Sequence, residues 1–284
     1  MTSTTNLERA SYATSTPRDA LFAVDPSVRR RRRDSTIVAI SRVLVVVTVL
    51  SSWQLVSGRL VSAFWISSPS EVFNALGRFW DDGVLWPAVQ TTLTETAIGF
   101  CGGAGAGILV GLVFGVSPII ARIFDPFFVG LNSIPRVALI PLFILWFGIG
   151  LETKVLFAAT LVFFPVFMNT FAGARDVDRD LIDVIRVMGA TRLDSVRKVL
   201  VPSALVWVFA GLRMSVPFAL IGAVIAEMFT ADDGLGYLIS VSANQYDTAS
   251  SFAAIFLTTI LGLILTYLVS LLESRTMRWR NIDD

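Results

Sequence analysis

Long apolar stretches alternate with short polar segments along most of this chain. A helix needs roughly 20 predominantly apolar residues to cross a hydrocarbon core of about 30 Å. The pattern predicts six transmembrane helices and therefore an all-α integral membrane protein. We expect these spans at about Ser35–Val56, Ala88–Gly115, Pro135–Phe147, Lys154–Phe171, Ser203–Met228 and Ser251–Leu272.

The polar segments between these spans suggest a simple domain organisation. An N-terminal segment rich in Ser, Thr and Arg shows no helical periodicity and ends in the arginine run Arg29–Arg33, so we expect it to be disordered and cytoplasmic. The predicted parts are this segment (1–34), a first transmembrane helix (35–57), an external interfacial segment (58–87), a membrane core (88–273) that contains a cytoplasmic loop (174–202), and a cytoplasmic tail (274–284).

The loop at 174–202 is an Arg-rich polar island that keeps a helical pattern. Apolar residues recur every three to four positions, which predicts a short amphipathic helix, at Leu181, Ile182, Ile185 and Met188. Gly189 interrupts this helix, and Thr191 with Asp194 forms a Thr-x-x-Asp capping pattern for a second one. Pro202 is expected to end the second helix or to bend it into the next span. The two helices suit the docking of a partner, although a solvated loop is the alternative.

The external segment carries a second amphipathic pattern. Pro69 and Ser70 are expected to open a helix whose apolar residues share one face, at Val72, Phe73, Leu76, Phe79 and Trp80. Trp65 and Trp86 flank it, and tryptophan is enriched at membrane interfaces. We predict that this helix lies in the membrane interface.

Five glycines form a regular stripe in the second predicted span. They recur every four residues, at Gly99, Gly103, Gly107, Gly111 and Gly115. Small residues at this spacing let another helix backbone approach closely. Static packing within the bundle and a moving or subunit-forming contact both remain open.

Four further residues in the spans are candidates for a solute pathway. Arg213 and Glu227 are ionisable groups at membrane depth, where such groups face the bundle or a cavity. An internal ion pair or backbone contacts are the alternative explanation, and for Arg213 that explanation and contact with a solute both remain open. Kinks at Pro135 and Pro141 leave backbone carbonyls unpaired, which is tolerated beside protein or a water-filled path.

Composition narrows the possible functions. With 54% hydrophobic and only 16% charged residues the chain is too apolar for an ordinary soluble domain. It has no histidine and one cysteine, Cys101, so the common zinc and haem ligand sets and a histidine-based triad are missing. No Gly-Lys pair occurs, which excludes a Walker-type ATP site. We therefore expect no catalytic residues, no metal site and no cofactor, and no nucleic acid as a partner.

Basic residues predict the orientation. Lys and Arg favour the cytoplasmic side of a membrane protein. With six spans and an internal N-terminus, only Arg59, Arg78 and Lys154 of the 23 basic residues fall outside, and Arg42, Arg136 and Arg213 fall within spans. We expect a multi-pass membrane protein with both termini in the cytoplasm.

The polar island resembles the cytoplasmic motif of permease subunits of ABC importers. That motif runs Glu-Ala-Ala, three residues, Gly, nine residues and Ile-x-Leu-Pro. Here Asp183-Val184-Ile185 takes the first place, Gly189 is the glycine, and Val199-Leu200-Val201-Pro202 closes the motif, with bulkier residues in place of both alanines. The resemblance implies contact with an ATPase through Asp183, Val184, Ile185, Met188, Gly189, Ala190 and Pro202.

A second likeness points to one subgroup of these importers. The run DPFFVGLNSIPRVALIPLFILWFGIG, from Asp125 to Gly150, resembles permeases for nitrate, sulfonates and taurine. The resemblance implies the type I ABC importer permease fold. It also implies an ABC ATPase dimer on the cytoplasmic face, an external or periplasmic solute-binding protein and a second permease copy, with a homodimer favoured. The expected solute is small and anionic, and ATP is hydrolysed by the partner subunit.

Two other classes of membrane protein remain as alternatives. An ion-gradient-driven secondary transporter is expected to show an internal repeat with broken helices at matching positions, and the sequence shows none. A membrane enzyme needs a cluster of polar catalytic groups at one depth, which the spans lack. The importer is therefore the favoured interpretation.

Overall fold

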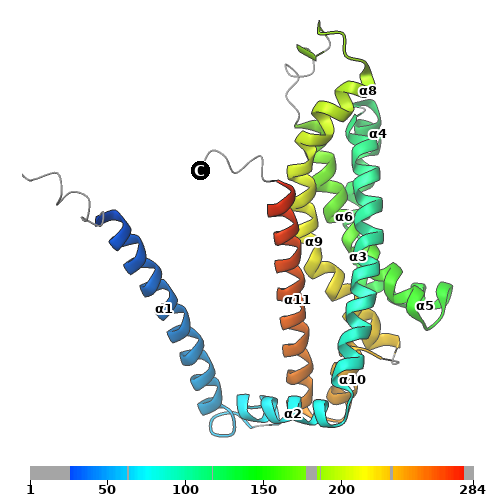
Figure 1. Cartoon of the computed structure of the whole chain (residues 1–284). Helices are drawn as coiled ribbons and strands as arrows, with labels where there is room; N and C mark the ends of the chain where they lie inside the picture. Colours follow the sequence, from blue (N-terminus) through cyan, green and yellow to red (C-terminus); the bar gives the residue numbers. More distant parts are fainter. Residues whose placement is uncertain are drawn as a thin grey trace, which may run out of the picture. The chain divides into compact units, whose positions relative to one another are not determined.

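The computed structural model describes residues 26–62, 64–116, 118–176, 184–185, 187–230 and 233–277. These residues are almost entirely helical (Figure 1), and their only β contact is an isolated bridge between Ser57 and Val61. The all-helical prediction is confirmed for this part of the chain. The chain divides into two compact units, Met1–Val56 and Ser57–Asp284, which we describe separately.

The first unit contains helix α1 (Pro26–Val56). The helix begins nine residues before the predicted start at Ser35. The last part of the segment 1–34, from Pro26 onward, is therefore helical and not disordered as predicted. Proline is favoured in a first helical turn and arginine is a good helix former, which explains the earlier start. The apolar part of the helix is Ile40–Val56. Residues 1–25 lie outside the described residues.

Helix α2 (Pro69–Asp81) begins with a complete capping box. The Ser68 hydroxyl accepts a hydrogen bond from the backbone N–H of Glu71, and the Glu71 carboxylate accepts one from the backbone N–H of Ser68. The apolar residues predicted to share one face of this helix differ in burial. Val72 and Phe79 are buried, whereas Phe73 and Trp80 are 75% and 72% exposed, because the helix packs against α11 on only one side.

Three long helices form the centre of the second unit, α3 (Leu85–Val116), α6 (Leu151–Arg175) and α9 (Val201–Thr230). Their shared core contains Ala104 of α3, Val162 and Val166 of α6, and Ala219 of α9, all buried. Helices α10 (Leu235–Asn244) and α11 (Thr248–Thr276) pack against α9, with α10 beside the end of α9 that carries Glu227 (Figure 1).

The glycine stripe of α3 lies against α6. A Cβ atom added at Gly99 would lie 2.7 Å from Ala158 Cβ, and one added at Gly111 would lie 2.7 Å from Thr170 Cβ. A Cβ at Gly103 would collide with the backbone oxygen of Ala159. The stripe thus allows close approach of two helices of the same chain, as the static-packing interpretation predicts.

The third predicted span is broken. Helix α4 (Pro118–Asn132) is followed by the 3₁₀ turn η1 (Arg136–Leu139) and the short helix α5 (Ile140–Phe147). The segment Pro126–Asn132 is bent by 79° from Arg136–Phe147. The centroid of the Phe128 ring of α4 lies 4.2 Å from that of Phe167 and 5.3 Å from that of Phe114. These aromatic contacts hold α4 in the bundle.

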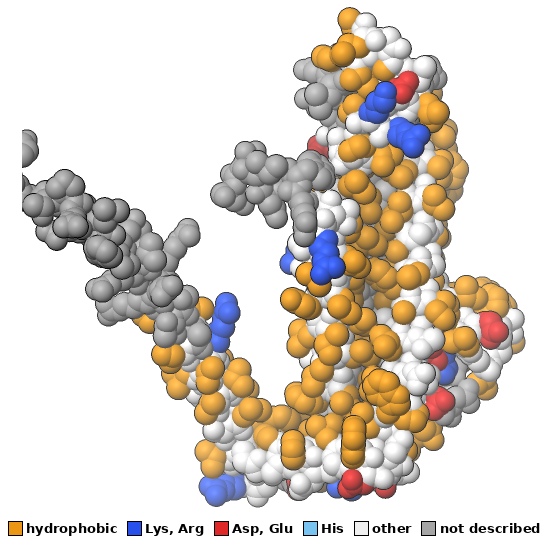
Figure 2. Space-filling view, viewed as in Figure 1, with side chains coloured by type: hydrophobic (Ala, Val, Ile, Leu, Met, Phe, Trp, Pro, Cys, Tyr) orange, Lys and Arg blue, Asp and Glu red, His pale blue; other side chains and the backbone are white. Residues whose placement is uncertain are grey.

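The number of spans differs from the prediction. Among the described residues four helices are long and apolar enough to cross a membrane, or five if the bent pair counts as one span. The apolar part of α1 is shorter. The count of six is therefore not reproduced, although the visible bundle is covered along most of its length by hydrophobic side chains, as Figure 2 shows. Such a surface is typical of helices that contact lipid.

Candidate functional site

The predicted coupling loop presents apolar side chains to solvent. Val184 is 57% exposed, Val187 90% and Met188 80%, and Leu193 beyond the glycine is 74% exposed. Helical backbone is present at Val184 and its described neighbours, whereas Asp183 lies outside the described residues. An exposed apolar cluster at one end of a bundle is typical of a protein docking surface.

Gly189 has the backbone conformation that the loop requires. Its φ is +86°, in the left-handed region that glycine adopts without steric cost. The backbone N–H of the next residue, Ala190, donates to the carbonyl of Ile185 at 3.0 Å, which closes the helix end. No atom lies within 4 Å of a Cβ added at Gly189, so a larger residue would be strained by its backbone and not by its neighbours.

The predicted second helix of the loop is capped as its sequence suggests. The Thr191 hydroxyl donates to Asp194 Oδ2 at 2.6 Å, and the Asp194 backbone N–H donates to Thr191 Oγ1 at 3.2 Å. Lys198 Nζ lies 3.0 Å from Asp194 Oδ1. Hydrogen bonds from Thr191 and Lys198 lower the pKa of Asp194 from 3.8 to about 2, so this carboxylate is ionised at any physiological pH.

Pro202 does not end the helical path. Helix α8 (Arg192–Ser195) continues into a π-helical turn, η2 (Val196–Leu200), and α9 begins at Val201. Pro202 therefore lies in the first turn of α9, directly after the π-helical turn. Leu200 is buried against Ala174 of α6, with Leu112 of α3 beside them. The loop thus contacts α6 and α3 through one small apolar cluster and continues directly into α9.

Arg213 is paired within the chain. Its Nη1 atom lies 3.6 Å from Glu273 Oε2 of α11, and its side chain is 56% exposed. This geometry fits the internal ion pair that we considered as one of two explanations. The partner reduces the net positive charge that Arg213 offers to a solute.

Glu227 is fully buried and receives two hydrogen bonds. The Thr92 hydroxyl donates to Oε1 at 2.6 Å, and the backbone N–H of Gly236 donates to Oε2 at 2.7 Å. A Cβ at Gly234 would collide with the Glu227 side chain, and one at Gly236 would collide with the backbone oxygen of Val224 and lie 2.9 Å from Glu227 Cβ. Glu227 thus fastens the start of α10 to the bundle, and no part of it is exposed to a pathway in this structure.

The sequence analysis missed a buried ion pair beside Glu227. Lys154 Nζ of α6 lies 3.0 Å from Glu95 Oε1 of α3, and the two side chains are 5% and 2% exposed. We had counted Lys154 among the external residues without a partner, whereas its position at the start of α6 lets it reach a carboxylate on the neighbouring helix. Glu95 lies within the second predicted span, and an ionisable residue at that depth was a signal for such a partner.

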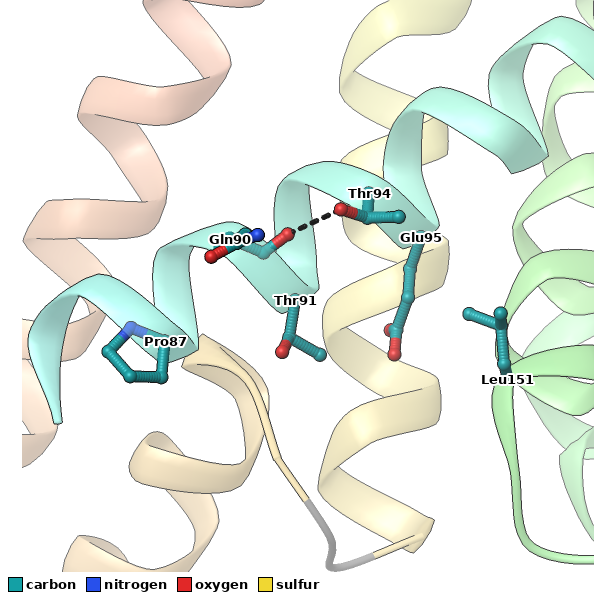
Figure 3. A pocket seen from close by; sticks show the side chains of 6 residues that line it. All are labelled: Pro87, Gln90, Thr91, Thr94, Glu95 and Leu151. Carbon is teal, nitrogen blue, oxygen red and sulfur yellow. Dashed lines mark hydrogen bonds between the residues drawn. The ribbon is translucent and has the colours of Figure 1, made fainter.

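An open cavity of about 300 Å³ lies beside this ion pair. Its polar wall belongs to one face of α3, and Leu151 of α6 lies opposite, as Figure 3 shows. The Thr94 hydroxyl donates to the Gln90 carbonyl at 2.8 Å (Figure 3). The lining residues are Pro87, Gln90, Thr91, Thr94, Glu95 and Leu151.

The two prolines of the third span have different positions. Pro135 directly precedes η1 and lies in the break between α4 and α5. Pro141 lies in the first turn of α5, where a proline causes no kink. We expected kinks at both prolines, and the helical path is interrupted only at Pro135.

Comparison with known proteins connects these features to one family. Residues 103–278 match the family described as the binding-protein-dependent transport system inner membrane component. A permease named for aliphatic sulfonates transport in Bacillus subtilis (strain 168) is 34% identical, over 84% of this chain and 87% of that protein. The riboflavin transport system permease protein of Chloroflexus aurantiacus is 34% identical, over 90% and 96%.

The fold is shared with a solved transporter. A methionine ABC transporter in inward-facing conformations aligns with a TM-score of 0.57 and 23% identity, over 69% of this chain and 95% of that chain. The sequence matches extend over most of both proteins, and the exposed loop around Gly189 lies within the matched region. The family does not support the gradient-driven alternative, because its transport depends on a binding protein. This chain belongs to the binding-protein-dependent family of ABC importer permeases.

Proposed function

We propose that this permease forms the path for a small anionic solute of the aliphatic sulfonate class, with taurine and nitrate as chemically related candidates. The observation that carries this proposal is the 34% identity to the sulfonates permease of Bacillus subtilis over most of both chains. The riboflavin permease of Chloroflexus aurantiacus is also 34% identical, so an uncharged aromatic solute is the competing possibility that the experiment has to exclude.

Coupling to an ABC ATPase is assigned to the loop around Gly189. The exposed apolar side chains of Val187, Met188 and Leu193 provide the surface on which the ATPase docks. Movement of that surface reaches α6 and α9 through the contact of Leu200 with Ala174. A packed helix end transmits a rigid-body displacement well, because close-packed side chains resist compression.

The remaining partners follow from the family and from the charge distribution. A second permease copy completes the path, with a homodimer favoured, and a solute-binding protein docks at the end that carries α2 and α10. Basic residues gather at the opposite end of the chain's spans, which supports a bacterial inner membrane location with both termini in the cytoplasm. The predicted domain boundaries, from the N-terminal segment to the tail after residue 273, stay part of this proposal.

Uptake by a purified complex tests the function. The permease, copurified from native membranes with its ATPase and binding protein, is reconstituted into vesicles with ATP on the ATPase side. We expect ATP-dependent import of ethanesulfonate, taurine or nitrate. Import of riboflavin without any of the three anions would contradict the solute class. Import driven by an ion gradient without ATP would contradict the importer mechanism.

The backbone at Gly189 yields a specific prediction about coupling. Gly189→Val is expected to lower solute uptake per ATP hydrolysed by about tenfold, because a β-branched residue in the left-handed region costs roughly 1–2 kcal/mol and displaces the docking surface. Gly189→Asn is the matched control, since asparagine tolerates this conformation and is expected to keep most of the coupling. Uptake and phosphate release are measured in the same vesicles. Normal coupling in Gly189→Val would rule out this role of the loop.

A further inference from the structure

The break between α4 and α5 exposes irregular backbone along a span. Residues 133–135 connect α4 to η1, and on either side of Pro135 the side chains of Ile134 and Val137 are 40% and 49% exposed. Irregular backbone at membrane depth is tolerated where protein covers it or where it lines water, and not against lipid. The described part of this chain leaves it uncovered, so it faces either a second protein surface or an aqueous path.

Arg136 lies at this break, and within the described part of the chain its guanidinium donates one hydrogen bond. Its guanidinium carbon is 4.5 Å from the centre of the Phe164 ring, and Nη2 donates to Asn132 Oδ1. A guanidinium has five N–H donors. Phe164 lies near the middle of α6, so the charge is held away from both ends of that helix.

Two basic residues within the long helices, Lys154 and Arg213, differ from Arg136. Lys154 is paired with Glu95, and Arg213 is paired with Glu273. Among the side chains that the structure describes, no carboxylate forms an ion pair with Arg136. Arginine stays protonated in any protein environment, so this charge is balanced by something other than the carboxylates that the structure describes.

We propose that the break between α4 and α5 lines the aqueous solute path and that Arg136 contacts the anionic group of the passing solute. A planar guanidinium can donate to two oxygens of a sulfonate or a nitrate at once, and stacking on Phe164 holds its plane in one orientation. This inference rests on the proposed function, because it assigns the charged contact of the same path to a residue.

Thiol labelling tests whether the break is open to water and favours anions. Ser133→Cys is made in a Cys101→Ser background, because Cys101 is the only native cysteine. The reconstituted complex is treated with two methanethiosulfonate reagents of similar size, one sulfonated and one with a trimethylammonium group, and the mass of the permease is followed. We expect labelling by both reagents, with the anionic one reacting several times faster. Arg136→Gln is expected to abolish this preference.

Uptake provides the second measurement. Arg136→Gln is expected to lower import of ethanesulfonate, taurine and nitrate by roughly tenfold or more, the value of a charged hydrogen bond, whereas Arg136→Lys keeps a larger part of it. Arg122→Gln, which changes an exposed arginine of the preceding helix α4, is the matched control and is expected to leave import unchanged. Basal ATP hydrolysis and the yield of intact complex are expected to be equal in all variants.

The outcomes separate this inference from the proposed function. If neither reagent labels the cysteine, a second protein surface covers the break and the inference is overturned. Labelling without an anion preference, or normal anion import by Arg136→Gln, also overturns it while the proposed function stands. Import of riboflavin and of none of the three anions by the unmodified complex overturns both the solute class and the contact with Arg136.

Discussion

Lys154→Met is expected to destabilise this permease by about 3–5 kcal/mol, the cost of leaving a buried charge without its partner. Lys154 and Glu95 are 5% and 2% exposed, and their atoms Nζ and Oε1 are 3.0 Å apart. After the substitution, Glu95 keeps its burial and lies beside the second buried carboxyl group, that of Glu227. The expected result is a large drop in the denaturant midpoint of the purified permease.

A double variant isolates the cause of this effect. Adding Glu95→Leu to Lys154→Met removes both charges and is expected to restore most of the stability, because apolar replacement of a whole buried ion pair is often nearly neutral. Lys198→Met is the control, since its pair with Asp194 is exposed and is worth at most about 1 kcal/mol. Equal midpoints for Lys154→Met and Lys198→Met would contradict the burial of the ion pair.

Gly103→Val is expected to cause the second large loss of stability. The added Cβ would collide with the backbone oxygen of Ala159 and would lie 2.9 Å from its Cα atom. Backbone atoms cannot rotate away, so α3 and α6 have to separate along their contact, and overpacking of this kind costs about 1–3 kcal/mol or more. The measurement is the yield of monodisperse protein after extraction, together with its denaturant midpoint.

Other glycines provide matched controls for this prediction. Gly102 and Gly105 lie on the same helix, and nothing lies within 4 Å of a Cβ added at either position. Gly102→Val and Gly105→Val therefore make the same substitution on the same helix without the collision. We expect near-normal yields of both variants. Gly115→Ala would collide with the Ala174 side chain, and Ala174→Gly is expected to relieve that collision. Similar yields for Gly103→Val and Gly102→Val would contradict the packing.

The order of apolar and polar residues was sufficient to predict a helical membrane protein and a polar loop with two helices hinged at Gly189. Local signals are strong in these cases: a capping pattern at Thr191 and a glycine at a helix end act through neighbouring backbone groups. The motif of the family spans the same residues, so the resemblance could be identified without a structure.

The partners of the charged residues depended on the tertiary structure. Lys154 was assigned to the outside because charge counting treats each residue alone, whereas its burial depends on Glu95, which lies far away in the sequence. Arg213 was a pathway candidate and Arg136 was only counted as lying within a span, whereas the packing of α11 supplies Glu273 as a partner to Arg213. Long-range contacts of this kind depend on which helix faces lie together, and hydropathy alone does not contain that information.

The position of the break between α4 and α5 also depended on the tertiary structure. Two prolines were visible in the sequence, yet only Pro135 interrupts the helix, because Pro141 falls in a first turn where its missing N–H is not needed. The periodicity of the chain therefore predicts its helices and its family, because both are local properties. The pairing of buried charges and the place of the break are decided by tertiary packing, since the cost of a charge or a free carbonyl depends on what surrounds it.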